Sequence, residues 1–186
     1  ILRRRVLMDN LPNDLRDVKV VCVNGELKIR EMSRDAEMKI TSADDLDSFI
    51  EAEKDRKEKI SRSILQSGAR VVLCSGEIDK DVLHMLCEKS VLVVEGLDSS
   101  ELRNASAATG ARIVESPLDI EESDLGRCGS ASWERKPASD EVEDVIRIEE
   151  CPHPSVVTIE IGGAGETGTE EVIRGIHDSL RSTSLA

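Results

Sequence analysis

The stretch ARVVLCSGEIDKDVLHMLCEKSVLVVEGLDSSELRNASAATGARIV, residues 69–114, decides the fold class. It contains three short apolar runs of strand length, residues 69–74, 91–95 and 111–114. Between them lie two segments with helical spacing of apolar residues, 78–89 and 99–109. This alternation of strands and helices implies right-handed crossovers and a mostly parallel sheet. Because the runs are continuously apolar, we expect a layered α/β domain with helices flanking the sheet.

The residues before this stretch predict one more strand and a long helix. Residues 18–23 (VKVVCV) are β-branched and precede Asn24-Gly25, a strong turn signal. Residues 38–41 suggest a short extended piece, and the polar residues after them offer helix N-caps. The helix should run from about residue 44 to residue 66 and stop at Gly68.

The apolar residues of that long helix lie only near its ends. They are Leu46, Phe49 and Ile50 near its start, and Ile60, Ile64 and Leu65 near its end. Between them, residues 51–59 (EAEKDRKEK) contain no apolar side chain except Ala52, although a helix packed along its whole length needs one every three or four positions. We therefore expect the N-terminal half to project into solvent, supported by i,i+4 ion pairs such as Glu53 with Lys57. The alternative is an ordinary solvated helix at a domain edge.

The helix over residues 78–89 has two apolar faces. Val82, Met85 and Leu86 form one stripe, and Leu83 and Cys87 lie about 100° away from it. One face should pack on the sheet. The other would either be plain core or line an open groove beside the long helix, with Lys80 and His84 at its edge. Such a groove would suit an extended or unfolded polypeptide.

The C-terminal third predicts further strands and a last helix. The expected strands are residues 132–136, 145–149 and 156–161, the first two as antiparallel neighbours. The expected helix is 169–180. The glycine-rich segment between them, Gly163 to Gly168, fits the G-x-G-x-x-G pattern of a phosphate-binding turn. A dinucleotide-binding fold needs a second strand after the helix, and the sequence shows none there. We therefore favour a flexible hinge, and a small nucleotide-binding enzyme domain is the alternative interpretation.

Composition excludes several classes of protein. The chain has 186 residues, and 25 basic against 38 acidic side chains give a net charge of −13, which argues against a nucleic-acid partner. Its aromatic residues are only Phe49 and Trp133, so stacking platforms are missing. No apolar run approaches the ~20 residues that span a bilayer. The chain does not begin with Met, and we interpret it as part of a longer protein.

The cysteines and histidines form no recognisable site. The 5 cysteines, Cys22, Cys74, Cys87, Cys128 and Cys151, include no C-x-x-C pair, and we expect buried reduced thiols in a cytoplasmic protein, without a metal. The 3 histidines are scattered and predict no catalytic triad. A self-contained hydrolase is therefore not expected.

Four motifs in a fixed order resemble the apical region of a group II chaperonin, the family of archaeal thermosome and eukaryotic cytosolic chaperonin subunits. They are SGARVVLC, ATGARIV, DLG before WERK, and CPHPSVVTIEIGG. The resemblance implies an apical, client-binding domain over residues 1–150, with a helical protrusion over about 36–62. It also implies that residues 151–186 belong to the intermediate domain and hinge.

The resemblance further implies roles for individual residues. It implies that clients bind to Lys80, Leu83, His84 and Cys87. It implies that the lid protrusion contains Leu46, Phe49 and Ile50. It places the hinge at Gly162 and Gly163. Asp178 in IHDSL matches the aspartate that activates water for ATP hydrolysis in the family. The resemblance implies an ATP- and magnesium-dependent parent in a double ring with other subunits, acting on unfolded proteins. The nucleotide loops are not in this sequence, so we expect no cofactor and no enzymatic activity in this fragment alone.

Overall fold

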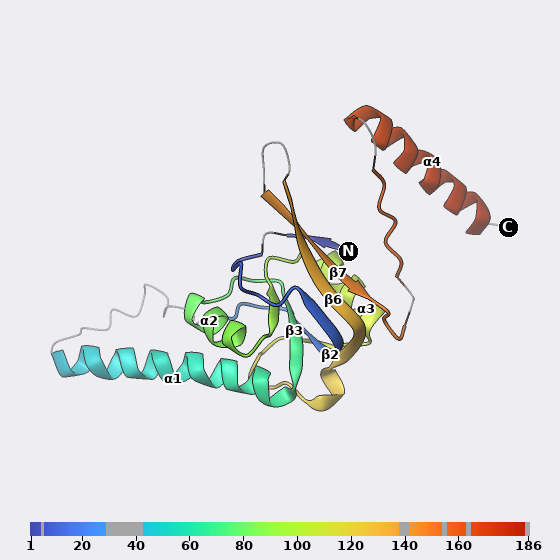
Figure 1. Cartoon of the computed structure of the whole chain (residues 1–186). Helices are drawn as coiled ribbons and strands as arrows, with labels where there is room; N and C mark the ends of the chain where they lie inside the picture. The colour runs from blue at the N-terminus through green and yellow to red at the C-terminus, as the bar shows by residue number, and fades with distance from the viewer. Residues whose placement is uncertain (5, 29–42, 138–141, 154–155, 163–164, 185–186) are drawn as a thin grey trace, which may run out of the picture. The chain divides into compact units, whose positions relative to one another are not determined.

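The computed structural model describes all residues except 5, 29–42, 138–141, 154–155, 163–164 and 185–186 (Figure 1). The chain divides into two compact units, Ile1–Val156 and Val157–Ala186. The first unit holds one seven-stranded sheet, in the order β1-β7-β6-β2-β3-β4, with β5 also paired to β2. The strands are β1 (Leu2–Arg3), β2 (Asp14–Val23), β3 (Ala69–Cys74), β4 (Leu92–Val94), β5 (Ile113–Val114), β6 (Gly126–Pro137) and β7 (Val142–Glu149).

The sheet is mixed, so the expectation of a mostly parallel sheet is only half right. β2, β3, β4 and β5 pair in parallel, as the sequence alternation predicted. β6 pairs antiparallel with β2 and with β7, and β7 pairs antiparallel with β1. β2 begins at Asp14, earlier than predicted, because its polar first residues Asp14 and Arg16 pair with Ser132 and Ser130 of β6.

The predicted helices are confirmed, with shifted ends for some of them. They are α1 (Ala43–Ser67), α2 (Lys80–Glu88), α3 (Ser99–Thr109) and α4 (Glu166–Ser184). α1 ends at Gly68, which has a φ of +80°. Glycine adopts this left-handed conformation at little energetic cost because it has no Cβ atom. Gly110 ends α3 in the same left-handed conformation, with φ +77°.

Hydrophobic clusters lie on both faces of the sheet. One cluster joins Val21 and Val72 of the sheet to Ile64 of α1 and Leu86 of α2. The other contains Leu102 of α3 and alternate residues of the same strands. Because side chains alternate across a strand, two helices thus cover one face and one helix covers the other. This confirms the layered α/β class.

The predicted strand 156–161 is wrong, since its described residues have no regular secondary structure. The alternation that suggested it, in VVTIEI, leaves Val157 79% exposed and Ile159 54% exposed. A strand needs a hydrogen-bonded neighbour, and the described chain pairs none with this segment. The short extended piece expected at 38–41 lies outside the described residues.

Candidate functional site

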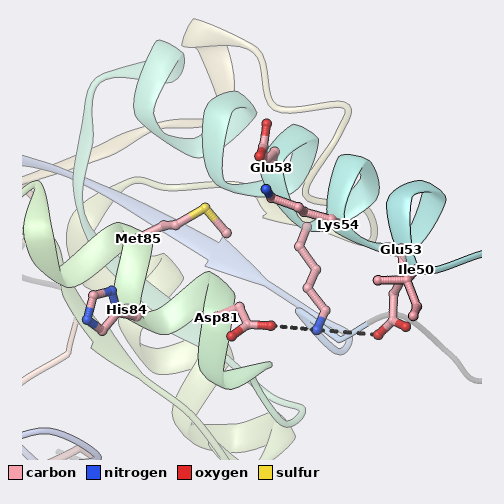
Figure 2. Close-up of a pocket in the computed structure, with 8 residues that line it drawn as sticks. Ile50, Glu53, Lys54, Glu58, Asp81, His84 and Met85 are labelled. Carbon is pink, nitrogen blue, oxygen red and sulfur yellow. Dashed lines mark hydrogen bonds and ion pairs between the residues drawn. The ribbon is translucent and has the colours of Figure 1, made fainter. Parts of the chain in front are cut away.

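A groove runs between α1 and α2 on the outer side of the first unit. Its first hollow has a volume of about 470 Å³ and lies between Ile50 and Glu53 of α1 and His84 and Met85 of α2 (Figure 2). A second hollow of about 400 Å³ continues along Leu65 of α1. Glu58 and Met85 line both hollows, so we treat them as one α1–α2 groove.

The N-terminus of α2 is fixed by Asp79. Its extended backbone, with φ −64° and ψ 139°, and its side chain make it the N-cap, which accepts a hydrogen bond from the Asp81 amide at 2.9 Å. Its carbonyl accepts from the Leu83 amide at 2.9 Å and closes the first turn. This cap holds two carboxylates, on Asp79 and Asp81, at the end of the helix that faces α1.

Lys57 of α1 binds both of these carboxylates. Its Nζ lies 2.7 Å from Asp81 Oδ2, 3.2 Å from Asp79 Oδ2 and 3.3 Å from Glu53 Oε1, and dashed lines in Figure 2 mark the contacts to Asp81 and Glu53. The hydrogen bond to Asp81 is the main cause that raises the pKa of Lys57, and the Lys57 ammonium lowers the pKa of Asp81. This Lys57 cluster ties the charged middle of α1 to α2.

The groove combines a few apolar side chains with charged walls. Met85 and Leu65 are half-buried in it, and Ile50 is exposed at one end. Around them stand carboxylates and amines of both signs, on Glu53, Lys54, Glu58, Arg62, Glu88 and Lys89. A thioether on a flexible chain adapts to differently shaped apolar partners. The arrangement can therefore receive an apolar side chain of a peptide while its polar neighbours stay hydrated.

Two of the four predicted client-binding residues lie elsewhere than expected. His84 lines the groove, and Lys80 is exposed on α2. Leu83 and Cys87 are only 4% and 7% exposed and belong to the core, which corrects their predicted place in the groove. The physical reason is that both apolar faces of α2 are covered: the Cys87 thiol, for example, reaches the Asn10 carbonyl at 3.6 Å.

Sequence reasoning missed Met85, the residue at the centre of the groove. It belongs to the predicted stripe with Val82 and Leu86, which are fully buried, whereas Leu83 and Cys87 were the residues predicted for the groove. Met85 follows the exposed His84 and precedes Leu86, so it lies on the border between the polar and apolar faces. That border position is the only signal that could have identified it.

The predicted lid residues lie in the first two turns of α1, the end of the helix that extends past α2 (Figure 1), and Ile50 also lines the groove. Phe49 and Ile50 are exposed, and no residue from 48 to 59 is buried. Leu46 belongs to α1, but its side chain lies outside the described residues. The buried residues Ile60, Ser61 and Ile64 begin where the helix reaches the core.

The second unit presents its predicted residues to solvent. Asp178 is exposed on α4, Gly162 is exposed in the irregular segment, and Gly163 lies outside the described residues. The described residues between β7 and α4 form no strand, so the strand that should lead directly into a phosphate-binding turn is not seen there. No group of three His, Cys, Asp or Glu side chains that could hold a metal ion occurs among the described residues. None of the helices that the structure describes is long and apolar enough to cross a bilayer.

Comparisons with known proteins agree with this architecture. The model of the TCP-1/cpn60 chaperonin family matches residues 1–186. A thermosome subunit from Methanocaldococcus jannaschii is 36% identical over 91% of this chain and 31% of its own length. The thermosome subunit beta of Archaeoglobus fulgidus is 30% identical over 100% of this chain and 33% of its own length.

The solved structure of the open state monomer of a group II chaperonin from Methanococcoides burtonii has the same fold. Its TM-score is 0.72 at 19% identity, over 97% of this chain and 38% of that chain. The chain thus spans about a third of the length of the curated relatives that it matches.

Proposed function

The chain belongs to the TCP-1/cpn60 chaperonin family, as a group II chaperonin segment, and we propose that it is the segment that binds unfolded client proteins. The observation that carries this proposal is the open α1–α2 groove with Met85 at its centre. Exposed apolar groups of a client would be buried against Met85 and Leu65. Each buried Å² of apolar surface contributes about 25 cal/mol, so one groove binds weakly and many grooves bind well.

The revised set of client-binding residues differs from the set that the sequence suggested. Met85 and Leu65 replace the buried Leu83 and Cys87, His84 stays in the groove, and Lys80 acts only at its rim. We assign the projecting part of α1, with Leu46, Phe49 and Ile50, to a lid that contacts neighbouring subunits. Exposed apolar side chains on an otherwise charged helix support that assignment.

The remaining roles concern the whole chaperonin. We assign residues 1–150 to the apical domain and 151–186 to the intermediate domain, with a hinge at Gly162 and Gly163. The parent would be a cytoplasmic double-ring ATPase that uses magnesium, and Asp178 would activate water for hydrolysis there. Asp178 is an exposed carboxylate on α4, which would let it reach a nucleotide held elsewhere in the parent.

The test is whether Met85 controls client capture. The chain is mixed with a chemically denatured client enzyme, and aggregation is followed by light scattering. Met85→Glu should lose most of the protection, because a carboxylate in the groove cannot bury apolar client surface. The matched control is Leu118→Glu, since Leu118 is an exposed apolar residue that lines neither hollow.

Equal protection by Met85→Glu and by the unaltered chain would contradict the proposal. Equilibrium dialysis against ATP and NAD addresses the nucleotide-binding alternative. We expect neither nucleotide to bind to the chain, and stoichiometric binding would replace the client-binding interpretation.

A further inference from the structure

Cys128, near the start of β6, and Cys151, two residues after the end of β7, adjoin the same backbone hydrogen bond. The ladder pairs Ser130 with Glu149, and one position further the Gly129 amide donates to the Glu150 carbonyl at 3.1 Å. Cys128 and Cys151 are the next residues beyond this hydrogen bond, although β7 has ended and Glu150, with φ +56°, turns the chain out of the regular ladder. A disulfide requires Cα atoms about 4.4–6.8 Å apart, a range that two residues adjoining one backbone hydrogen bond can reach.

Both side chains also face the same core. Cys128 is buried in the cluster that contains Val18 and Ala131, and Cys151 packs against that cluster while remaining partly exposed. Burial is the main cause that raises the pKa of Cys128 to about 12, and negative charge on Cys151 raises it further. Both thiols are free in the structure.

We propose that Cys128 and Cys151 form a reversible disulfide with hydrogen peroxide as the oxidant. Cys151 reacts first because it is the more exposed thiol. Its thiolate attacks one peroxide oxygen, breaks the O–O bond and becomes a sulfenic acid, and the hydroxide released takes up the Cys151 proton as water. The Cys128 sulfur then attacks the sulfenic sulfur and forms the S–S bond, and the departing hydroxide leaves with the Cys128 proton as a second water. The two thiols together lose two electrons to one peroxide, and a dithiol reverses the reaction.

The link would fix the segment through which the chain leaves the sheet. Cys151 lies shortly before Val156, where the first compact unit ends. His153 already packs on the end of α3, since a Cβ added to Gly110 would lie 2.9 Å from its Cδ2 atom. Oxidation would add a covalent bond to these contacts. This proposal does not depend on client binding, because neither cysteine lines the α1–α2 groove.

The test uses the whole chain, treated with hydrogen peroxide at about pH 9, where more thiolate is present than at neutral pH. Circular dichroism verifies that the protein stays folded, and peptide mapping by mass spectrometry identifies linked cysteines. We expect the Cys128–Cys151 peptide pair as the main product, with the loss of two hydrogen atoms and full reversal by dithiothreitol. The linked pair should be lost in Cys151→Ser and retained in Cys22→Ala, whose cysteine lies on another strand.

Hydrogen exchange supplies a second readout. The Gly129 amide should exchange more slowly in the oxidised chain than in the reduced chain, because its partner Glu150 is then held next to a covalent link. Different pairing of the cysteines in the folded protein, or oxidation of Cys151 to the sulfinic acid without a linked peptide, would overturn the proposal.

Discussion

Asp144 is a charged residue that the core encloses completely, with 0% exposure. Its Oδ2 accepts from the Val6 amide at 2.6 Å, and its Oδ1 accepts from Arg135 Nε at 2.9 Å. The Arg4 amide also donates to its backbone carbonyl at 3.1 Å. One carboxylate thus connects the N-terminal segment to β7 and, through Arg135, to β6.

We expect Asp144→Ala to lower the free energy of unfolding by about 3 kcal/mol, because it leaves the buried Val6 amide without an acceptor and removes the buried carboxylate that Arg135 binds. Urea denaturation followed by the fluorescence of Trp133, the only tryptophan, measures the change. Asp9→Ala is the matched control: Asp9 also binds Arg135, at 2.7 Å, but it is exposed. The control should cost less than about 1 kcal/mol. Equal effects of the two variants would show that the burial of Asp144 does not matter.

At the scale of elements, the Lys57 cluster determines how α1 lies on α2. Lys57 contacts three carboxylates. Lys54 lies one turn earlier and forms no ion pair with any residue that the structure describes. Lys57→Ala should therefore loosen the contact between the helices, at a cost of about 1 kcal/mol for a partly exposed network. Hydrogen exchange should become faster in residues 48–57 and in the first turn of α2. Lys54→Ala changes the same residue type on the same helix and should leave the exchange unchanged.

The same cluster should respond to acid. Lys57 lowers the pKa of Asp81 below its ordinary value of 3.8 and its own pKa is raised, so both groups stay charged throughout the neutral range. A carboxyl with a lowered pKa stabilises the fold above that pKa and loses this contribution as the pH falls through it. Exchange protection of α1 should therefore persist down to about pH 4 and decrease below it. Asp81→Asn should show less of this acid dependence, and an identical acid response would contradict the assignment.

At the scale of the whole molecule, the client proposal depends on repetition of one weak groove. Several copies of this chain on a flexible multivalent scaffold should retain a denatured client far better than the same amount of single chain, by a factor of about 10² or more. Surface-immobilised client and dissociation rates measure the difference. The scaffold carrying Met85→Glu should show no such gain. Strong retention by both scaffolds would indicate that another surface binds the client.

Most elements could be predicted from the sequence because their signals are local. The continuous apolar runs identified β3 and β4, and Gly68 and Gly110 marked the ends of α1 and α3. The early part of β6 was missed, since its Gly126–Ser130 residues lack β propensity and are extended only because β2 pairs with them. The predicted strand at 156–161 failed for the opposite reason: its alternation is favourable, but none of the described strands pairs with it.

The candidate site was harder to predict because it depends on contacts between distant segments. Helical spacing correctly paired Lys57 with Glu53, but Asp79 and Asp81 reach Lys57 only through the packing of α2 on α1. Periodicity gave α2 two apolar faces and could not show that both would be covered. Leu83 was therefore placed in the groove, whereas the fold buries Leu83 and brings Met85 to the groove.

The path of the chain between β2 and β3 has a consequence for how such proteins can vary. β2 and β3 are parallel neighbours in the sheet. Just beyond their C-terminal ends, an isolated parallel β-bridge pairs Leu27 with Ile78. The helix α1 thus belongs to an insertion between two neighbouring strands, and the sheet holds the two ends of this insertion together. Doubling the length of a flexible insertion costs only about 0.6 kcal/mol in loop entropy. Insertions of different length between β2 and β3, or a reporter domain inserted there, should leave the sheet unchanged. The connection between these two strands is therefore a suitable insertion site for protein engineering.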